Sequence, residues 1–347
     1  MLKAVLFRSE RRFESFRDRL EKSGVQVTVL DFDGPEWVEY DFSTTDIVIY
    51  FPEFTFSSNH PLALYRVHDN LMHIHQLYPR IQMFPDPHVI FFYCDKYRQH
   101  LFLKAKGFPY PETYALNAQT SLDLVEHQLG YPMVLKNRFG AGGDYVFKVD
   151  SRNQLEHYFR LSQMDMFRLG TLRHFFSLLS KRLFYYFLVR IRRMPYPFLS
   201  APLLAQRFIS HDRDIKTVVG DGKVVEAHWR RKATNGMWKV NIDGGGIGEW
   251  SYVPPEITKL SERLAQDLDT SWLNIDIIQS EGSFLITEFS PVWHHYAYKE
   301  KSSFVYKDDY NIEVPLEISL DLERIIVESF LRRASNQDNM LHDQTQV

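Results

Sequence analysis

The spacing of apolar and polar residues predicts an α/β unit at the start of the chain. Three short apolar runs are typical of buried strands, at residues 4–7, 25–30 and 46–51. A charged stretch with helical spacing lies between the first two runs, at 11–22, and another helical pattern covers 61–77. Strands that alternate with helices are typical of βαβ units, so we expect residues 1–92 to form a small N-terminal α/β domain.

Short strands dominate the pattern in the rest of the chain. Runs rich in β-branched residues and separated by Gly or Asp turns lie at 204–209, 215–219, 223–229, 275–278 and 284–287. Helical patterns cover 95–106, 255–268 and 320–333. We therefore expect a larger α+β unit over residues 93–333, with a central part at about 109–205, and a polar, flexible tail at 334–347.

The composition is that of a folded globular protein. Hydrophobic residues make up 44% and charged residues 24% of the sequence, a balance that argues against extensive disorder. The net charge of -3 supplies no general attraction to nucleic acid, so we expect no nucleic-acid partner. Cys94 is the only cysteine, which excludes an internal disulfide bond and a zinc site built from cysteines.

Charge and hydropathy also bear on location. Charged residues follow the first apolar residues of the chain too early for the apolar core of a signal peptide. No stretch has the uncharged length that a membrane span needs. Together with the single cysteine, these features lead us to expect a cytoplasmic protein.

A lysine at the end of a predicted strand runs into a glycine-rich turn. The strand-like run 131–136 ends at Lys136, and Gly140, Gly142 and Gly143 follow. Glycines let backbone N–H groups converge on an anion, and the lysine adds a positive charge, so the segment suits a phosphate group. A glycine-rich hairpin without a ligand is the alternative interpretation, and the spacing is not that of a P-loop.

Two acidic residues further along the chain form a second candidate site. Asp276 lies within an apolar strand pattern, and Glu288 ends the strand that follows across a tight turn. Alternation puts Asp276 on the face opposite Ile275 and Ile277, so both carboxylates can point into one cleft. Facing carboxylates repel unless a cation lies between them, and oxygen ligands beside phosphate favour Mg²⁺. Taken singly, each residue is better explained as a solvated acid, and only the pairing favours a metal site.

The order of these segments resembles that of the ATP-grasp ligases, especially the RimK-like ribosomal-protein glutamate ligases, over about residues 85–295. The resemblance implies an ATP-grasp fold preceded by an N-terminal α/β domain. It also implies a carboxylate–amine ligase that uses ATP and Mg²⁺ and forms an amide bond through an acyl phosphate. The substrates would be a small-molecule or peptide carboxylate and an amine. The resemblance identifies neither of them, nor an oligomeric state.

The resemblance implies nucleotide-binding roles for several segments. Lys96 and Lys136 match the lysines that grip the phosphates in that family, and the glycine turn matches its flexible loop. The adenine-binding hinge and the acid that follows it are matched by Gln206, Arg207, Phe208, Ile209 and Asp214. Arg207 departs from the family, which has glutamate there, so we expect a different polarity at the adenine edge.

Catalytic and metal-binding roles are implied in the same way. The residues that match the catalytic elements of the family are Arg230, Arg231, Lys239 and Asn241. Those that match its magnesium ligands are Asp276, Glu288 and Ser290. Ser290 stands in place of an asparagine, and because a hydroxyl is a weaker ligand than an amide oxygen, we expect weaker binding of a second metal ion. For the paired arginines, a solvated strand face is the alternative.

Two other activities fit the same sequence. A chain with Ser290 in its metal site could bind ATP without ligating, and an ATP-grasp protein could instead transfer phosphate to an alcohol or a sugar. The fold alone does not separate these activities from a ligase, because one fold supports several chemistries.

A segment at about 160–200 has no counterpart in that family. Between residues 166 and 211 the chain has no acidic residue, while arginine, lysine and aromatic residues are frequent. A basic, aromatic amphipathic helix can lie on an anionic membrane or bind an acidic polymer, so residues 166–193 predict peripheral contact with such a surface. The alternative is a helix packed on the central part with its arginines in water.

Overall fold

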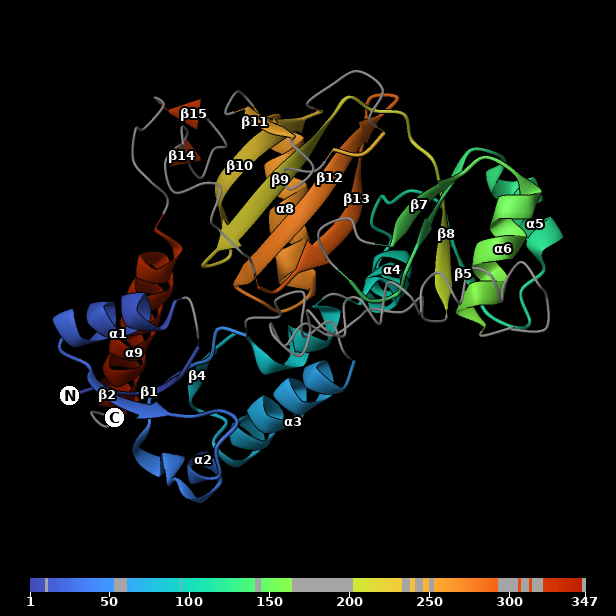
Figure 1. Cartoon of the computed structure of the whole chain (residues 1–347). Coiled ribbons are helices and arrows are strands. Elements are labelled where there is room, and N and C mark those ends of the chain that lie inside the picture. Colours follow the sequence, from blue (N-terminus) through green and yellow to red (C-terminus); the bar gives the residue numbers. More distant parts are fainter. Residues whose placement is uncertain are drawn as a thin grey trace.

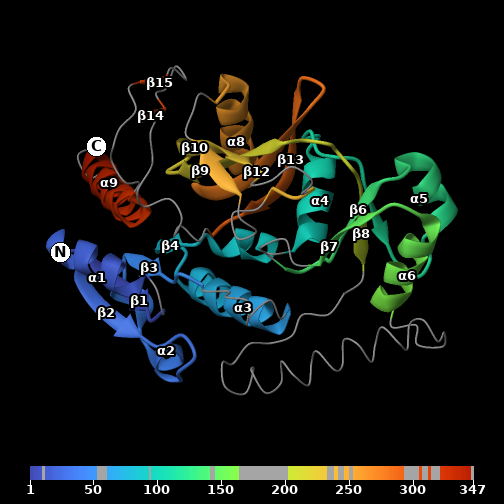
Figure 2. The same cartoon turned by 45° about the horizontal axis from the view of Figure 1, so that its top comes forward.

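The computed structural model organises the chain around three main sheets (Figure 1). It describes residues 1–9, 12–52, 61–93, 95–140, 145–163, 202–232, 238–240, 246–249, 253–292, 305–306, 312–313 and 321–344. The five-stranded sheet lies between the N-terminal sheet and a second four-stranded sheet in both Figure 1 and Figure 2. The predicted basic segment, at about 160–200 with its core at 166–193, lies almost entirely outside the described residues.

The N-terminal sheet is parallel, as the alternation of strands and helices predicts. Its strand order is β2 (Gln26–Leu30), β1 (Lys3–Phe7), β3 (Ile47–Ile49) and β4 (Gln82–Phe84). The elements that accompany it are α1 (Phe13–Lys22), α2 (Glu36–Glu39), η1 (Phe42–Thr44), α3 (Pro61–Leu77) and η2 (Pro87–Phe92). Residues 4–7 and 47–49 are fully buried, which explains their unbroken apolar runs.

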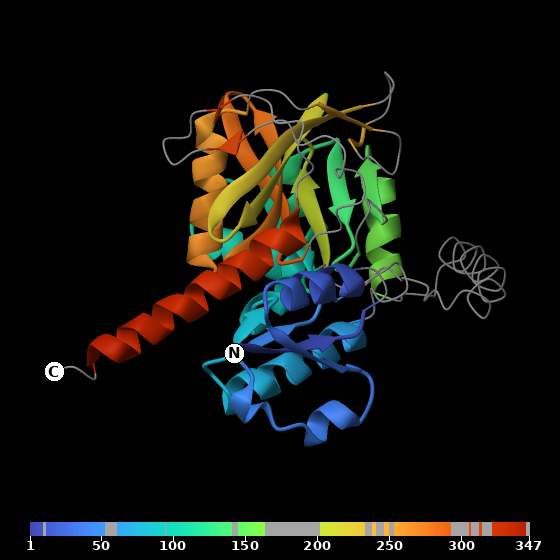
Figure 3. The ribbon, with the colours of Figure 1, turned by 90° about the vertical axis from the view of Figure 1, so that its left-hand side faces the viewer.

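The C-terminal helix α9 (Leu322–Gln344) returns to this N-terminal sheet. Leu322, Ile326 and Phe330 join the buried cluster formed by β1, β3 and α1. Figure 3 shows α9 lying against α1 and extending beyond it. The helix runs to Gln344 and so includes most of residues 334–347, the predicted flexible tail. The domain boundaries at residues 92 and 333 stay predictions.

The five-stranded sheet is antiparallel and has two unlike faces. Its strand order is β11 (Ile247–Glu249), β10 (Lys223–Arg231), β9 (Arg213–Gly220), β12 (Trp272–Ser280) and β13 (Ser283–Ser290). Helix α8 (Pro255–Asp267) covers one face, where Ile215, Ile275 and Ile277 are buried. Because side chains alternate along a strand, the polar residues between these positions face the other side.

The second four-stranded sheet is antiparallel and carries the lysine strand. Its strand order is β5 (Thr113–Leu116), β8 (Leu203–Arg207), β6 (Met133–Lys136) and β7 (Val146–Val149). The remaining described elements are α4 (Lys96–Ala105), α5 (Leu122–Leu129), α6 (Arg152–Ser162), β14 (Val305–Tyr306) and β15 (Ile312–Glu313). Helix α4 lies between this sheet and the five-stranded sheet (Figure 2).

The predicted combination of α/β and α+β architecture is confirmed by these sheets. Within the described residues, no helix combines the length and the apolar character needed to cross a membrane.

The contact of α9 with α1 depends on a buried ion pair. Arg12 and Glu323 are 5% and 6% exposed, and the Arg12 guanidinium donates a hydrogen bond to the Glu323 carboxylate. We predict that Glu323→Ala lowers the apparent free energy of unfolding by about 3 kcal/mol, because the buried guanidinium loses its carboxylate. Urea unfolding measures this loss.

The matched control is Glu328→Ala, on the exposed side of the same helix, where the carboxylate lies 4.0 Å from Arg324. This variant should unfold close to the wild-type urea midpoint, because exposed ion pairs contribute little. Equal midpoint shifts for the two variants would contradict the structural importance of the buried pair.

Candidate active site

The face of the five-stranded sheet opposite α8 carries a row of polar side chains. His228, Lys216, Asp276 and Glu288 occupy neighbouring register positions on β10, β9, β12 and β13. Directly opposed residues on one face have Cβ atoms about 4.5–5.5 Å apart, so this register brings the side chains together. The predicted pairing of Asp276 with Glu288 across the hairpin is therefore present in the structure.

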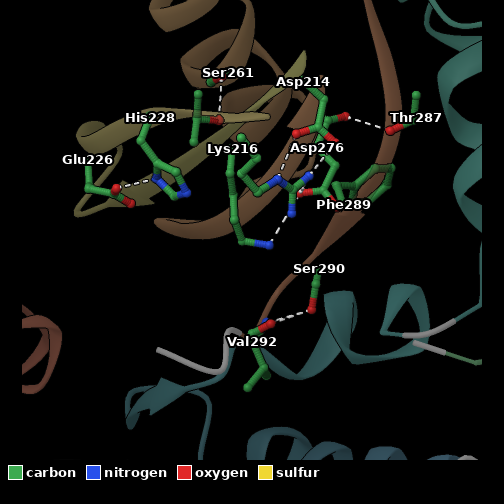
Figure 4. A network of polar contacts seen from close by, with 12 residues as sticks. Asp214, Lys216, Glu226, His228, Ser261, Asp276, Thr287, Phe289, Ser290 and Val292 are labelled. Atoms are coloured by element: carbon green, nitrogen blue, oxygen red, sulfur yellow. Dashed lines mark hydrogen bonds and ion pairs between the residues drawn. The ribbon is translucent and has the colours of Figure 1, made fainter. Parts of the chain in front are cut away.

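Two cations share the Asp276 carboxylate. Lys216 Nζ donates to Asp276 Oδ1 at 3.2 Å, and Arg230 Nη2 lies 3.2 Å from the same oxygen. Arg230 in turn donates two hydrogen bonds to Asp214, from Nε to Oδ1 at 2.7 Å and from Nη2 to Oδ2 at 2.8 Å. Figure 4 shows Lys216, Asp214 and Asp276 gathered at this point. The network holds a guanidinium in a fixed orientation between two carboxylates.

These contacts shift the pKa values of Asp276 and Asp214 in opposite directions. Desolvation acts to raise the pKa of Asp276, but Arg230 and Lys216 outweigh it and lower that pKa to about 2. Burial raises the pKa of Asp214 above its usual range, although Arg230 opposes the change. Of Asp276 and Asp214, Asp276 is thus the one that stays firmly ionised. A carboxylate ligand of a cation has to be ionised.

Lys96 reaches this row from the first turn of α4. Its Nζ lies 3.6 Å from Glu288 Oε1 and donates to the backbone carbonyl of Gly140. The helix is fixed to the edge strand by Gln99, whose side-chain amide donates to the Phe289 carbonyl at 2.6 Å and accepts from the Phe289 N–H at 3.3 Å. These two hydrogen bonds pair the backbone N–H and carbonyl of Phe289 in β13. They also fix the position of α4 and therefore of Lys96.

The start of the glycine turn is tied to the same helix end. Asp95 caps α4 by accepting from the N–H groups of Tyr97 and Arg98, and it also accepts hydrogen bonds from Arg138 Nε and Nη2, the shorter at 2.9 Å. Gly140 has φ of +132°, a conformation that favours glycine. The predicted loop residues Gly142 and Gly143 lie outside the described residues.

Lys136, at the end of β6, completes the positive cluster. Desolvation lowers the pKa of Lys136 to about 8, and the neighbouring Lys96 adds to that effect, whereas Glu288 and Asp276 act to raise the pKa. The lysines of α4 and β6 thus share the electrostatic field of the paired carboxylates of β12 and β13. A low pKa at a cluster of charges is typical of a functional site.

The predicted adenine hinge spans the end of β8 and the two residues after it. Gln206 is buried and donates to Thr113 at 2.9 Å, whereas Arg207 is exposed and donates to Glu112 and to the Gln128 carbonyl. The Phe208 ring lies 5.2 Å from Lys148 Nζ and 6.5 Å from the Trp238 ring. Ile209 is partly exposed, and its carbonyl lies 2.7 Å from Nδ1 of His211.

Of the predicted catalytic residues, Arg230 and Arg231 lie on opposite faces of β10. Arg230 lies within the polar face, but Arg231 alternates to the other side, where Nε donates to Glu249 Oε1 at 2.5 Å. Lys239 Nζ lies 5.0 Å from the Trp238 ring centre. Asn241 lies outside the described residues. The alternative of a solvated strand face therefore describes Arg231 but not Arg230.

The hydroxyl of Ser290, the third predicted metal ligand, is engaged elsewhere. It donates to the carbonyl of Val292 and accepts from the Val292 N–H at 3.2 Å. Figure 4 shows Ser290 directed toward Val292, away from Asp276. A local turn thus uses the donor and an acceptor position of this hydroxyl.

Sequence analysis missed a buried pair on the same face. Glu226 Oε1 and His228 Nδ1 are 2.5 Å apart, and the two residues are at most 2% exposed. They precede Arg230 by four and two positions along β10, so alternation alone could have placed them on its face. The same reasoning applies to Lys216, two residues after Asp214 on β9.

The residues present suit a hard cation bound by oxygen. Asp276 and Glu288 offer carboxylate oxygens side by side, and the amide oxygen of Asn274 on the same face is buried without a hydrogen-bond partner in the described structure. No three histidine, cysteine, aspartate or glutamate side chains gather into a metal-sized cluster within the described ranges. A cation here would depend on a neutral oxygen donor or on phosphate for its remaining ligands.

Comparisons with known proteins show which proteins the chain resembles. Residues 192–294 match a model described as a RimK-like ATP-grasp domain. The chain is 26% identical over 193 residues to β-citrylglutamate synthase B of Danio rerio, covering 54% of this chain and 38% of that protein. It is 26% identical over 197 residues to a probable α-L-glutamate ligase of Maridesulfovibrio salexigens, covering 56% of this chain and 54% of that protein.

A solved structure extends the likeness over nearly the whole chain. The ATP-grasp ligase PsnB, complexed with a minimal precursor, Mg and ADP, superimposes with a TM-score of 0.58 at 13% identity, covering 96% of this chain and 98% of that one. At this identity the likeness concerns the fold. The chain spans at most about half the length of the two curated relatives described above.

The charge cluster predicts how the pKa of Lys136 responds to substitution. Glu288→Gln removes a carboxylate that stabilises the ammonium, so the pKa should fall below about 8; Lys96→Gln removes a like charge, so it should rise. Titration of reductively ¹³C-methylated protein, followed by NMR, measures both. Glu256→Gln, on the exposed side of α8, is the control and should leave the Lys136 resonance unchanged; opposite or absent shifts would refute the cluster.

Proposed function

We propose that this chain, which has the ATP-grasp fold and matches a RimK-like ATP-grasp domain at residues 192–294, is an ATP- and Mg²⁺-dependent ligase. The reaction joins a carboxylate to an amine through an acyl phosphate and produces an amide bond, ADP and inorganic phosphate. One observation carries the proposal: two facing acids, Asp276 and Glu288, lie beside two lysines, Lys96 and Lys136, that come from other elements.

The two lysines are suited to the nucleotide phosphates. Lys96 and Lys136 lie at the start of a helix and at the end of a strand, and both are at least partly buried. Ammonium groups held in a partly desolvated site bind phosphate oxygens more strongly than they would in water. The proposed hinge at residues 206–209 begins within β8, the strand next to β6, and would contact the adenine.

Asp276 and Glu288 would hold Mg²⁺ in the same cluster. Mg²⁺ bound there would neutralise charge on the phosphate oxygens during transfer. In the structure, the positive groups of Lys216, Arg230 and Lys96 lie 3.2 to 3.6 Å from the carboxylate oxygens of these acids and offset their negative charge. The same cations are then within reach of incoming phosphate and carboxylate anions when a metal ion occupies the acids.

Arg230 is the best-placed residue to orient the substrate carboxylate. Its guanidinium is held from one side by Asp214 and faces Asp276 with Nη2. A fixed guanidinium recognises carboxylates and stabilises negative charge that develops at a reacting centre. We assign no such role to Arg231, which lies on the opposite side of β10.

The reaction balances without a further reactant. A carboxylate oxygen of the first substrate attacks the terminal phosphorus of ATP, the bond to ADP breaks, and an acyl phosphate forms. The amine nitrogen then attacks the acyl carbon, and phosphate leaves as the amide forms with loss of a proton. The positive cluster lowers the cost of each anionic species.

We propose an acidic amino acid as the amine substrate. The names of the curated relatives point to glutamate in β-citrylglutamate and α-L-glutamate products. The site holds four basic side chains, those of Lys96, Lys136, Lys216 and Arg230. An amine substrate that itself carries carboxylates suits so positive a site. Location in the cytoplasm, and peripheral attachment through residues 166–193, complete the proposal.

The activity test is release of inorganic phosphate from ATP and Mg²⁺ in the presence of L-glutamate and pools of carboxylates. We predict phosphate release that requires both an amine and a carboxylate, with an amide product found by mass spectrometry. Glu288→Gln should lower kcat at least roughly a hundredfold, because it removes a charged metal ligand worth several kcal/mol. Glu256→Gln should keep wild-type kcat.

The other activities give different products in the same assay. Phosphate attached to an alcohol or sugar would indicate a phosphotransferase. ATP binding without turnover across the pools would indicate a non-ligating protein. Full activity of Glu288→Gln would refute the role of that acid.

The phosphate role of Lys136 has its own test. We predict that Lys136→Ala weakens ATP binding at least about tenfold, because a charge-assisted hydrogen bond contributes about 1.5 to 3 kcal/mol. Calorimetric titration with ATP measures the affinity. Lys259→Ala, on the exposed surface of α8, is the control, and equal affinities of the two folded variants would exclude a phosphate contact.

A further inference from the structure

Asn274 brings an amide into the proposed metal site, and sequence analysis assigned it no role. It lies two residues before Asp276 on β12, so both side chains face the side of the sheet opposite α8. Its neighbours Leu273 and Ile275 are fully buried in the core beneath α8, which confirms the alternation. Asn274 itself is partly exposed.

The register makes Asn274 one corner of a square of four adjacent positions. Asn274 pairs with Ser290, and Asp276 pairs with Glu288, between the same two strands. The square therefore holds two carboxylates in one row and an amide beside a hydroxyl in the next. Side chains at such positions are within about 4.5–8 Å of one another at Cβ, the range over which one ion can collect ligands.

The amide oxygen of Asn274 is buried and accepts no hydrogen bond from the residues that the structure describes. Val218, its register neighbour on β9, is apolar and cannot donate from its side chain. Burying a carbonyl oxygen without a donor is unfavourable, because the atom loses its hydrogen bond to water, so such an atom calls for an explanation. A bound cation is one, because it would take the place of a donor that the described residues do not supply.

Ser290, the competing ligand in the same row, is less suited. Its hydroxyl both donates to and accepts from the backbone of Val292, and Val292 is itself buried in the N-terminal core. Turning this hydroxyl toward Asp276 would break both hydrogen bonds. Among the described residues, the Asn274 oxygen accepts no hydrogen bond that metal binding would break.

We propose that Asn274 supplies the neutral oxygen ligand of the divalent cation held by Asp276 and Glu288, in place of Ser290. The inference rests on the proposed function, because it completes the same metal site. Two carboxylates and one amide oxygen form a ligand set suited to Mg²⁺ beside phosphate.

Binding of Mn²⁺, used as a probe for Mg²⁺, tests the proposal apart from activity. The full chain is saturated with a non-hydrolysable ATP analogue, and Mn²⁺ affinity is measured by electron paramagnetic resonance. Asn274→Ala should weaken Mn²⁺ binding at least about tenfold, the lower end of what even the outer partners of metal ligands cost. Asn274→Asp, which keeps an oxygen and adds a charge, should bind Mn²⁺ at least as tightly as wild type.

Ser290→Ala is the matched control and should retain wild-type Mn²⁺ affinity. The proposal is overturned if Asn274→Ala binds Mn²⁺ like the wild type, or if Ser290→Ala loses as much affinity as Asn274→Ala. Affinity for the analogue in the presence of a chelator verifies that each variant keeps its nucleotide site.

Glu288→Gln separates this inference from the proposed function. Loss of Mn²⁺ binding in Glu288→Gln but not in Asn274→Ala would leave the metal site standing and remove Asn274 from it. Wild-type Mn²⁺ affinity in both variants would refute the metal site itself, and with it both proposals.

Discussion

The architecture of the candidate site depends on neutralising carboxylates on one face of a sheet. Desolvating Asp276 and Asp214 is costly, and the cost is offset only because Arg230 lies between them and Lys216 reaches Asp276 from the adjacent strand. The order of β10, β9 and β12 makes this possible, since it sets the three side chains in neighbouring positions. Charges so arranged keep Asp276 ionised and give Arg230 a single orientation.

The rest of the fold brings further charges to that face from separate elements. Gln99 binds the edge of β13 and so sets the position of Lys96, while the contact of Asp95 with Arg138 ties the lysine strand β6 to the same helix. Below the polar row, Val218, Trp272 and Val292 are buried in the core shared with the N-terminal sheet and α9. Lys96 is buried and Lys136 is desolvated beside these cores, which strengthens the charge interactions in the site.

This arrangement bears on how metal binding and substrate binding would be coupled. Lys96, Lys216 and Arg230 form ion pairs with the acids of the site. A divalent cation bound to these acids would release three positive groups to interact with the phosphates and the substrate carboxylate. A neutral ligand such as Asn274 suits this exchange, because it binds a metal without needing its own counter-ion.

The sequence by itself determined which segments form strands and helices and which chemical groups they carry. Apolar residues that recur at every second position or at helical spacing predicted most of the strands and helices. The short turn between two predicted strands was enough to set Asp276 opposite Glu288. Alternation could equally have joined Glu226, His228 and Arg230. Only the tertiary structure decided which face α8 covers, and hence that Arg230 enters the site and Arg231 does not. It also decided that the Asn274 oxygen is buried without a hydrogen-bond donor among the described residues. Those choices depend on packing between distant segments, for which local periodicity holds no information.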